Sequence, residues 1–286
     1  MNSKTIMTGV FGYPIEQSLS PIMHNQAFRA LGLNFSYAAF AVAPDQLQQA
    51  VNGIRALGFA GVNVTIPHKV TIIPFLDEID QEAEEIGAVN TIVNDGGKLI
   101  GYNTDGAGYV ESLLEEWKVP LSGKRVMILG AGGAAKGVAV SLAKRGVESI
   151  FVANRSVDKA ESLAKQLSQY TKSGSLSSDH LKAKDFEGID LIINTTSVGM
   201  YPYEDNIPID PSLLHPGLMV SDLIYNPIET KLLLEAKKIG ACTHGGVGMF
   251  IHQGALAQQK WTGKQPPISL MMETVLDQLR NKNQAK

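Results

Sequence analysis

The sequence contains a single cysteine, Cys242, so it holds no internal disulfide framework and is typical of a reducing compartment. No stretch approaches the roughly 18 apolar residues of a membrane helix, and the first residues, MNSKTIMTGVFGYP, offer no signal peptide. The net charge of -3 gives no electrostatic reason to expect binding to nucleic acid or to an anionic membrane. We therefore expect a cytoplasmic globular protein without nucleic-acid or membrane partners.

Metal-ligand spacing is also missing from the sequence. The 6 histidines form no pattern such as H-E-x-x-H, so we expect no metal site. The length of 286 residues suits about two domains rather than one small core. With 44% hydrophobic and 19% charged residues, the composition is that of a folded protein and not of a disordered chain.

Strand-like and helix-like runs alternate along most of the chain. Continuous apolar runs such as RVMILG (125–130) and SIFVAN (149–154) are typical of parallel strands covered on both faces by helices. The stretch AVNTIVNDGGKLIGYNTD (88–105) predicts two strands joined by a tight turn. An acidic run at 75–87 predicts a solvated helix, and the polar run at 171–179 predicts a loop. This alternation predicts an α/β fold.

A glycine-rich segment directly after one predicted strand matches the pattern G-x-G-x-x-G/A. It consists of Gly130, Ala131, Gly132, Gly133, Ala134 and Ala135. Gly130 permits a tight turn, Gly132 lets the backbone approach a pyrophosphate, and the small Ala135 allows close packing of helix against strand. The helix that begins here adds free N–H groups and a favourable dipole. Because strand, loop, helix and second strand follow in the required order, we favour a dinucleotide site over a merely structural glycine turn.

The end of the next predicted strand indicates which dinucleotide is bound. A site for NAD usually has an Asp or Glu about 20 residues after the first glycine, where it grips the ribose 2′-hydroxyl. Here the sequence has Asn154, Arg155 and Ser156, and Lys159 follows one helical turn later. A guanidinium binds a 2′-phosphate with charge-assisted hydrogen bonds, whereas surface cations at a helix start are mildly unfavourable. We therefore expect NADP rather than NAD.

Two charged residues follow strand-like segments and are candidates for moving a proton. Lys69 ends NVTIPHK (63–69), and Asp105 lies in GYNTDGAG (101–108), flanked by glycines. Ligands of open α/β sheets gather beyond the carboxyl ends of strands, so both residues are candidates for a catalytic role. The alternative reading makes Asp105 a helix N-cap and Lys69 a surface residue whose amine reaches solvent, and for either residue alone this reading is favoured.

At this point the sequence resembles the shikimate dehydrogenase family over nearly its whole length. The matching blocks are GYPIEQSLSPIMHN (12–25), NVTIPHK (63–69), GAVNTI (87–92), GYNTDGAG (101–108), GAGGAAKG (130–137), NRS (154–156), NTTSVGM (194–200), DLIYNP (222–227) and GGVGMFIHQGA (245–255). The resemblance implies a substrate-binding domain over 1–106, with a mixed sheet, completed by C-terminal helices at 245–286. It implies a Rossmann-type NADP-binding domain, with a doubly wound parallel sheet, over 107–244.

By resemblance, the reaction is the reversible NADPH-dependent reduction of 3-dehydroshikimate to shikimate, on the route to chorismate and the aromatic amino acids. Lys69 and Asp105 look like the catalytic pair, with Lys69 as proton donor and acceptor. The residues that look like substrate contacts are Ser18, Ser20, Thr65, Lys69, Asn90, Asp105, Tyr225 and Gln253. The positions that match cofactor contacts are Gly130, Ala131, Gly132, Gly133, Ala134, Asn154, Arg155, Ser156, Lys159, Leu223, Gly246 and Met249.

Several alternatives stay open on the sequence alone. Ser18 and Ser20 also fit ordinary turn residues, and His68 fits either a cleft wall or the core. Thr195 and Thr196 fit either a cofactor contact or local backbone bonding. The rival functions are a quinate/shikimate dehydrogenase of the same family with broader substrate or NAD use, and a catalytically silent NADP(H)-binding regulator. Either a monomer or a homodimer is compatible with the sequence.

Overall fold

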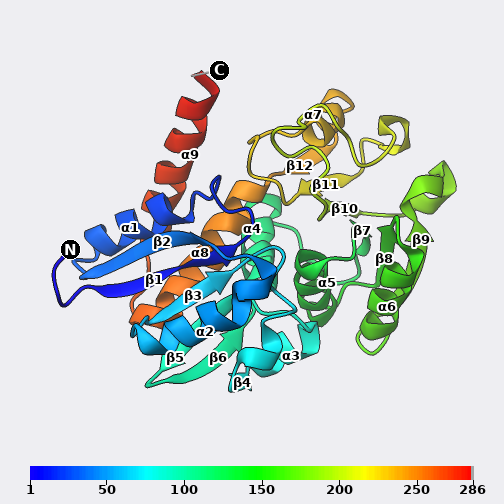
Figure 1. The fold of residues 1–286 in the computed structure, drawn as a ribbon. Helices are drawn as coiled ribbons and strands as arrows, with labels where there is room; N and C mark the ends of the chain where they lie inside the picture. The colour runs from blue at the N-terminus through cyan, green and yellow to red at the C-terminus, as the bar shows by residue number, and fades with distance from the viewer. Residues whose placement is uncertain (285–286) are drawn as a thin grey trace. The chain divides into compact units, whose positions relative to one another are not determined.

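The computed structural model describes residues 1–284, and the chain divides into two compact units (Figure 1). The first unit combines Met1–Asp105 with the segment from Ile251 onward, and the second unit is the continuous stretch Gly106–Phe250. The two-domain α/β fold expected from the sequence is confirmed. Within residues 1–284, no helix has the length and apolar character needed to cross a membrane.

The first unit is built on a six-stranded mixed sheet in the order β2-β1-β3-β5-β6-β4. Its strands are β1 (Ile6–Gly12), β2 (Phe35–Ala41), β3 (Gly61–Val64), β4 (Glu78–Ile79), β5 (Thr91–Asp95) and β6 (Lys98–Tyr102). Its helices are α1 (Ser20–Ala30), α2 (Leu47–Ala56), α3 (Gln81–Ile86), the larger part of α8 (Gly246–Thr262), and α9 (Ile268–Gln284). Strand β1 pairs in parallel with β2 and β3, while β5 is antiparallel to β3 and β6.

Local sequence explains why these elements form where they do. In α2, Leu47, Val51 and Ile54 recur at helical spacing and are buried in one core cluster. The predicted hairpin forms between β5 and β6, and Gly96 and Gly97 supply positive φ angles of 59° and 101° in its turn.

The C-terminal helices complete the first unit from the far end of the sequence. In Figure 1, α9 lies beside α1, and the two helices are in contact. The indole Nε1 of Trp261 in α8 donates a hydrogen bond to the Ile92 carbonyl of β5 at 2.9 Å. The helix is therefore fixed directly to the sheet.

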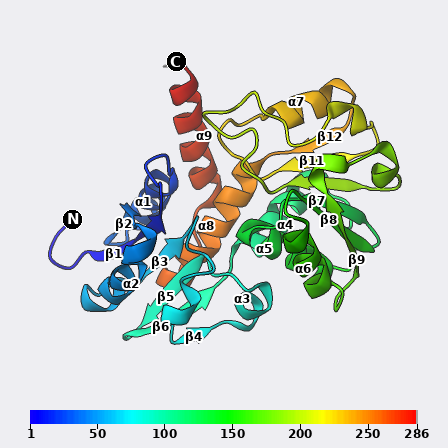
Figure 2. The same cartoon turned by 45° about the vertical axis from the view of Figure 1, so that its right-hand side comes forward.

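The second unit contains a six-stranded sheet in which every pairing is parallel, in the order β12-β11-β10-β7-β8-β9. Its strands are β7 (Arg125–Leu129), β8 (Ser149–Asn154), β9 (Lys172–Ser177), β10 (Leu191–Asn194), β11 (Met219–Asp222) and β12 (Cys242–His244). Its helices are α4 (Asp105–Trp117), α5 (Gly133–Lys144), α6 (Val157–Leu167) and α7 (Lys231–Lys238). Helix α8 begins within the last residues of this unit. Figure 2 shows α5 and α6 beside β7, β8 and β9, and α7 beside β11 and β12. This strand order is the doubly wound arrangement that binds dinucleotides at its switch point, here between β7 and β10.

Two local predictions were wrong. The polar run predicted as a loop contains strand β9, which pairs only with β8 and is mostly half-buried. An edge strand of this kind needs no apolar pattern, so composition hid it. The acidic run at 75–87 is not one helix, because it contains the short strand β4 before α3.

The boundary at which the chain returns from the second unit to the first falls inside a continuous helix. The division lies between Phe250 and Ile251, and both residues belong to α8. Sequence patterns mark the ends of helices, not a change of packing partner within one. This explains why the sequence expectation set the boundary at 244 instead.

Candidate active site

Lys69 and Asp105 form a buried ion pair within the first unit. The Nζ atom of Lys69 donates to Oδ2 of Asp105 at 2.5 Å, and the two side chains are only 16% and 6% exposed. The amine therefore points at a carboxylate and not into bulk solvent, which overturns the alternative reading of Lys69 as a surface residue. Charges removed from water are retained only where they are paired and hydrogen-bonded, as they are here.

The backbone around Lys69 is held from two sides. Strand β3 ends at Val64, and Lys69 lies in the turn that follows, with its carbonyl accepting from Val89 N at 2.8 Å. The neighbouring His68 is fully buried, and its Nε2 donates to the Val42 carbonyl at 2.7 Å. His68 therefore anchors this turn to the core, which settles its role in favour of packing.

Asp105 opens helix α4, and both of its carboxylate oxygens are bound. Oδ1 accepts from Asn90 Nδ2 at 2.7 Å, while Oδ2 accepts from Lys69. The backbone N–H of Asp105 donates to Asn103 Oδ1 at 3.0 Å, which fixes the entry into the helix. A carboxylate in the first turn also meets the positive end of the helix dipole.

The other predicted substrate residues of the first unit lie on several different elements. Ser18 and Ser20 follow β1, and Ser18 Oγ accepts from the Ser20 N–H at 3.3 Å. Thr65 follows β3, which pairs in parallel with β1. Within residues 1–284, no hydrogen bond joins the Thr65 side chain directly to Lys69 or Asp105. In α8, the Gln253 carbonyl accepts from Thr104 Oγ1 at 3.0 Å.

Asn90 connects the predicted residues to buried polar groups that the sequence reasoning missed. These groups are Tyr37, Asn63, Thr91, Asn103 and Thr104, and each is 7% exposed or less. The signal available for Asn63 was an amide inside the otherwise apolar strand GVNV. A buried polar side chain in such a strand needs partners, which predicts a hydrogen-bond network at that point.

The predicted phosphate loop has the backbone geometry that its glycines suggest. Gly130 has a φ of 109°, and a Cβ there would lie 2.5 Å from Thr195 Oγ1, so only glycine fits. Gly132 precedes helix α5 and has open space where a side chain would stand. Ala131 is buried, whereas Gly133 and Ala134 are partly exposed at the helix start. These features fit the close approach of a pyrophosphate to free N–H groups.

The tip of β8 carries the positive charges that were predicted to read a 2′-phosphate. Arg155, Ser156 and Lys159 are exposed, and Asn154 Nδ2 donates to the Ser156 carbonyl at 2.9 Å. Within the described part of the chain, neither Arg155 nor Lys159 forms an ion pair with an acidic side chain. Both cations are therefore available to an anionic ligand.

The remaining predicted residues of the second unit lie after β11 and at the start of α8. A Cβ at Gly246 would overlap the Leu223 carbonyl, so the backbones of these two segments approach closely. Met249 is buried, and the half-buried Tyr225 stacks on Phe250 with ring centroids 4.4 Å apart. Burial raises the pKa of Tyr225 to about 12, so its hydroxyl stays protonated at neutral pH.

A buried carboxylate that the sequence reasoning did not single out joins the end of β10, the segment after β11 and the start of α7. Asp222, at the end of β11, accepts from Asn194 Nδ2 at 3.1 Å, from Ile224 N at 3.0 Å and from Thr230 Oγ1 at 2.7 Å. Burial raises the pKa of Asp222 to about 6 despite these hydrogen bonds.

The two neighbouring threonines at the exit of β10 are occupied locally. Thr196 Oγ1 donates to Asn194 Oδ1 at 2.7 Å, and Thr195 Oγ1 donates to the Leu129 carbonyl at 2.7 Å. These contacts favour the reading of Thr195 and Thr196 as residues that satisfy local polar groups.

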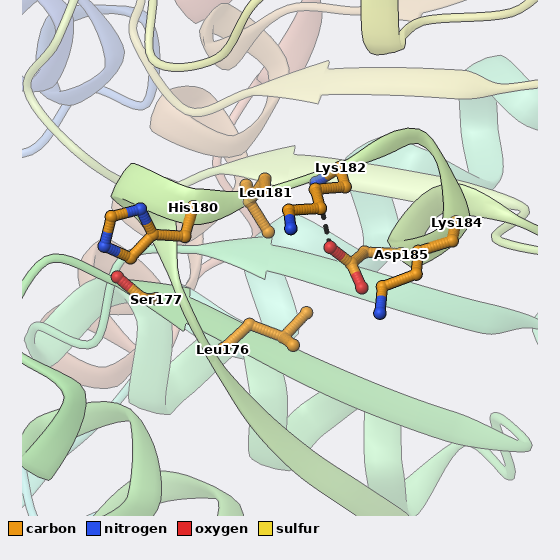
Figure 3. Close-up of a pocket in the computed structure, with 7 residues that line it drawn as sticks. All are labelled: Leu176, Ser177, His180, Leu181, Lys182, Lys184 and Asp185. Carbon is orange, nitrogen blue, oxygen red and sulfur yellow. Dashed lines mark hydrogen bonds between the residues drawn. The ribbon is translucent and has the colours of Figure 1, made fainter.

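A separate open hollow of about 260 Å³ lies at the carboxyl end of β9 (Figure 3). Its lining residues are Leu176, Ser177, His180, Leu181, Lys182, Lys184 and Asp185. Asp185 Oδ2 accepts from the Lys182 N–H at 2.9 Å. Ser177 pairs with Asn154 across the strands, so the hollow adjoins the tip of β8 and contains none of the predicted site residues.

The geometry defines the class of protein: an α/β oxidoreductase with a dinucleotide-type sheet in one unit and a lysine–aspartate pair in the other. Three family profiles match this chain. They are "Shikimate dehydrogenase substrate binding domain" over residues 10–92, "Shikimate / quinate 5-dehydrogenase" over 112–201, and "Shikimate 5'-dehydrogenase C-terminal domain" over 246–276. The chain belongs to the shikimate dehydrogenase family.

Individual relatives agree with this assignment. The chain is 51% identical over 273 residues to the shikimate dehydrogenase (NADP(+)) of Geobacillus kaustophilus, covering 95% of this chain and 98% of the relative. A solved shikimate dehydrogenase in complex with NADP+ superposes with a TM-score of 0.91 at 47% identity, over 98% of this chain and 97% of that one. The Thermus thermophilus enzyme in complex with NADP(H) and shikimate gives a TM-score of 0.86 at 35% identity, over 96% and 99% of the two chains.

Proposed function

We propose that this chain is an NADP-dependent shikimate dehydrogenase that catalyses the reversible reduction of 3-dehydroshikimate to shikimate. This reaction lies on the route to chorismate and the aromatic amino acids. The observation that carries the proposal is the buried Lys69–Asp105 pair at 2.5 Å, in a chain that belongs to this family. A regulator that only bound the dinucleotide would have no use for a desolvated proton-transfer pair.

In the reductive direction, Lys69 Nζ donates a proton to the ketone oxygen of 3-dehydroshikimate. NADPH, when bound, supplies the hydride. Asp105 holds the ammonium group in a fixed place, and it is itself held by Asn90, so the donor does not have to be reoriented. In the oxidative direction Lys69 first releases its proton to solvent, and the neutral amine then accepts the hydroxyl proton of shikimate. Acid–base assistance of this kind contributes roughly 10²–10⁴-fold in rate.

The first unit supplies most of the groups for the substrate in this proposal. Ser18 and Ser20 bind the carboxylate of shikimate with the help of Tyr225, and Thr65, Asn90, Asp105 and Gln253 serve the ring hydroxyls. Short hydroxyls and fixed amides suit a small polyhydroxy acid, because a missing substrate hydroxyl leaves a buried partner unpaired. Asn90 is only 2% exposed and its amide already bonds to Thr104 and Asp105, so we assign it chiefly to holding Asp105.

The second unit holds the cofactor in this proposal. The pyrophosphate lies over the loop from Gly130 to Ala134 at the start of α5, and the 2′-phosphate is bound by the segment from Asn154 to Ser156 together with Lys159. Leu223, Gly246 and Met249 lie at the nicotinamide end. Two exposed cations that have no carboxylate partner in the described part of the chain favour NADP over NAD. We also propose a cytoplasmic location, and a monomer or a homodimer as the working form.

A steady-state assay of the purified chain tests the proposal. NADP reduction is followed at 340 nm with shikimate as substrate, and quinate and NAD each replace one reactant in parallel reactions. We expect turnover with shikimate and NADP, and a much lower kcat/KM when either reactant is exchanged. Tight NADPH binding without any shikimate- or 3-dehydroshikimate-dependent turnover would refute the proposal.

A further inference from the structure

A continuous chain of buried hydrogen bonds runs through the first unit and ends on Asp105. The Tyr37 hydroxyl donates to Asn63 Oδ1 at 2.8 Å, and Asn63 Nδ2 donates to Thr91 Oγ1 at 3.1 Å. The Thr91 hydroxyl donates to Asn90 Oδ1 at 2.9 Å, and Asn90 Nδ2 donates to Asp105 Oδ1 at 2.7 Å. Every link therefore points in the same direction, from the phenol toward the carboxylate.

Backbone groups fix this direction. Asn90 Oδ1 accepts from the Thr104 N–H at 2.8 Å, so the amide nitrogen of Asn90 has to face Asp105. Asn63 Nδ2 donates to the Asn90 carbonyl at 3.2 Å, so the amide oxygen of Asn63 has to face Tyr37. A carbonyl only accepts and a backbone N–H only donates, which excludes the reversed orientation of either amide.

Tyr37 is held at the head of the chain by contacts that do not involve its hydroxyl. Asn25 bonds to both backbone groups of Tyr37, at 2.9 Å and 2.8 Å. The Tyr37 ring stacks on His24 with centroids 4.3 Å apart, and Trp261 lies 6.0 Å away. The residue is only 2% exposed, so removal of its hydroxyl leaves the ring in place.

The phenol of Tyr37 keeps the proton that it donates to Asn63. Burial raises the pKa of Tyr37 well above its usual value, so the hydroxyl stays protonated. The series of hydrogen bonds therefore begins at a neutral donor and ends at the proton-transfer pair.

We propose that Tyr37 is a positioning residue that acts through Asn63, Thr91 and Asn90 to hold Asp105. The inference rests on the function proposed above. Hydrogen bonds arranged head to tail polarise one another, by roughly 10–30% per bond, so the links act as a unit. Loss of the phenol leaves Asn63 Oδ1 without its donor, which removes the polarisation that the first bond passes along the series and so weakens every later link.

Two variants that each remove a single hydrogen-bonding group test this role. Tyr37→Phe deletes the first donor and Thr91→Val replaces the central hydroxyl with a methyl group of the same shape. We expect each to lower kcat/KM for shikimate roughly tenfold, since a hydrogen bond of this kind contributes about that factor. The KM for NADP should stay within about twofold of wild type, because the predicted cofactor residues do not belong to this series of hydrogen bonds.

The matched control is Tyr109→Phe. Tyr109 is equally buried, and its hydroxyl donates to Ser221 Oγ at 3.0 Å in the second unit. Its replacement should lower the melting temperature about as much as Tyr37→Phe does and leave kcat/KM for shikimate near wild type. An effect of Tyr37→Phe no larger than that of Tyr109→Phe would overturn the inference.

The double variant tests whether Tyr37 and Thr91 act through one connected series of hydrogen bonds or through two independent polar contacts. If the links act as a unit, Tyr37→Phe combined with Thr91→Val should lose about as much as the larger single change. Losses that multiply, to roughly a hundredfold, would contradict coupling through Asn63. A wild-type chain without shikimate turnover would refute the proposed function itself, whereas an active wild type with an unaffected Tyr37→Phe would refute this inference alone.

Discussion

The two units prepare their candidate chemistry in opposite ways. In the first unit the reactive groups are buried and already bonded, and Lys69, Asp105 and Asn90 hold one another in place. In the second unit the phosphate loop offers open space at Gly132, and the cations at the tip of β8 are exposed and have no acidic partner among residues 1–284. One unit is organised before any ligand arrives, and the other offers groups that a charged ligand can complete.

This contrast follows from what each step requires. A proton donor works efficiently only when its distance and direction are set before the reaction, which demands a dry and fully bonded site. A dinucleotide brings its own phosphate charges, so its site needs N–H groups and cations that remain free to meet them.

The largest effect is expected for the buried and already bonded site of the first unit. Lys69→Ala should lower kcat by roughly 10²–10⁴-fold, because it removes the proton donor, while substrate affinity changes by only several-fold. Steady-state kinetics with shikimate and NADP measure both quantities. The matched control is Lys98→Ala, since Lys98 pairs with Glu78 in the same unit but is 52% exposed. Near-normal turnover of Lys69→Ala would remove this lysine from the mechanism.

A smaller effect is expected for the exposed cofactor-binding groups of the second unit. Arg155→Ala should raise the KM for NADP by roughly 10–100-fold and change the kinetics with NAD little, because the lost interaction is a charge-assisted bond to the 2′-phosphate. Arg145→Ala is the control, since Arg145 is an exposed arginine at the opposite end of α5. Equal losses with NADP and NAD would mean that Arg155 does not read the 2′-phosphate.

The sequence predicted the second unit more directly than the first. The glycine pattern, the continuous apolar strands and the position of Arg155 are local features, and each one is visible within a few residues. Strand β9 escaped because an edge strand with a polar sequence looks like a loop. Strand β12 was not anticipated, because the three residues Cys242–His244 give too little pattern to read, and helix α7 was not anticipated either.

The site of the first unit was accessible mainly through family resemblance. Lys69 and Asp105 are 36 residues apart in the chain, and no spacing rule brings them to 2.5 Å. The series of buried hydrogen bonds is harder still to predict from the sequence, because Tyr37, Asn63 and Thr91 lie on three different strands and each fits an ordinary core position. Sequence alone shows that Asn63 needs partners, but only the fold shows which partners it has.

The smallest expected effect concerns stability and uses titratable groups that lie outside the proposed reaction. Burial lowers the pKa of His24 in the first unit and of His244 in the second unit to about 4. The unfolded chain binds these protons near pH 6.5, so stability that is present above that value is lost as the pH falls toward 4. Asp222, in the second unit, works in the opposite sense. Its folded pKa of about 6 exceeds the unfolded value of 3.8, so the folded state gains stability as the pH falls through this range.

The first unit should therefore be the more acid-sensitive of the two. Between pH 7 and pH 5 we expect it to lose about 2 kcal/mol of unfolding free energy through His24, and the second unit to lose less than about 1 kcal/mol because Asp222 offsets His244. Each unit contains one tryptophan, so Trp117→Phe leaves Trp261 to report on the first unit, and Trp261→Phe leaves Trp117 to report on the second. Urea unfolding followed by fluorescence at both pH values gives the two free energies. Asp222→Asn should remove the offset and make the second unit as acid-sensitive as the first, whereas equal losses in the two units without that substitution would show that Asp222 does not titrate in this range.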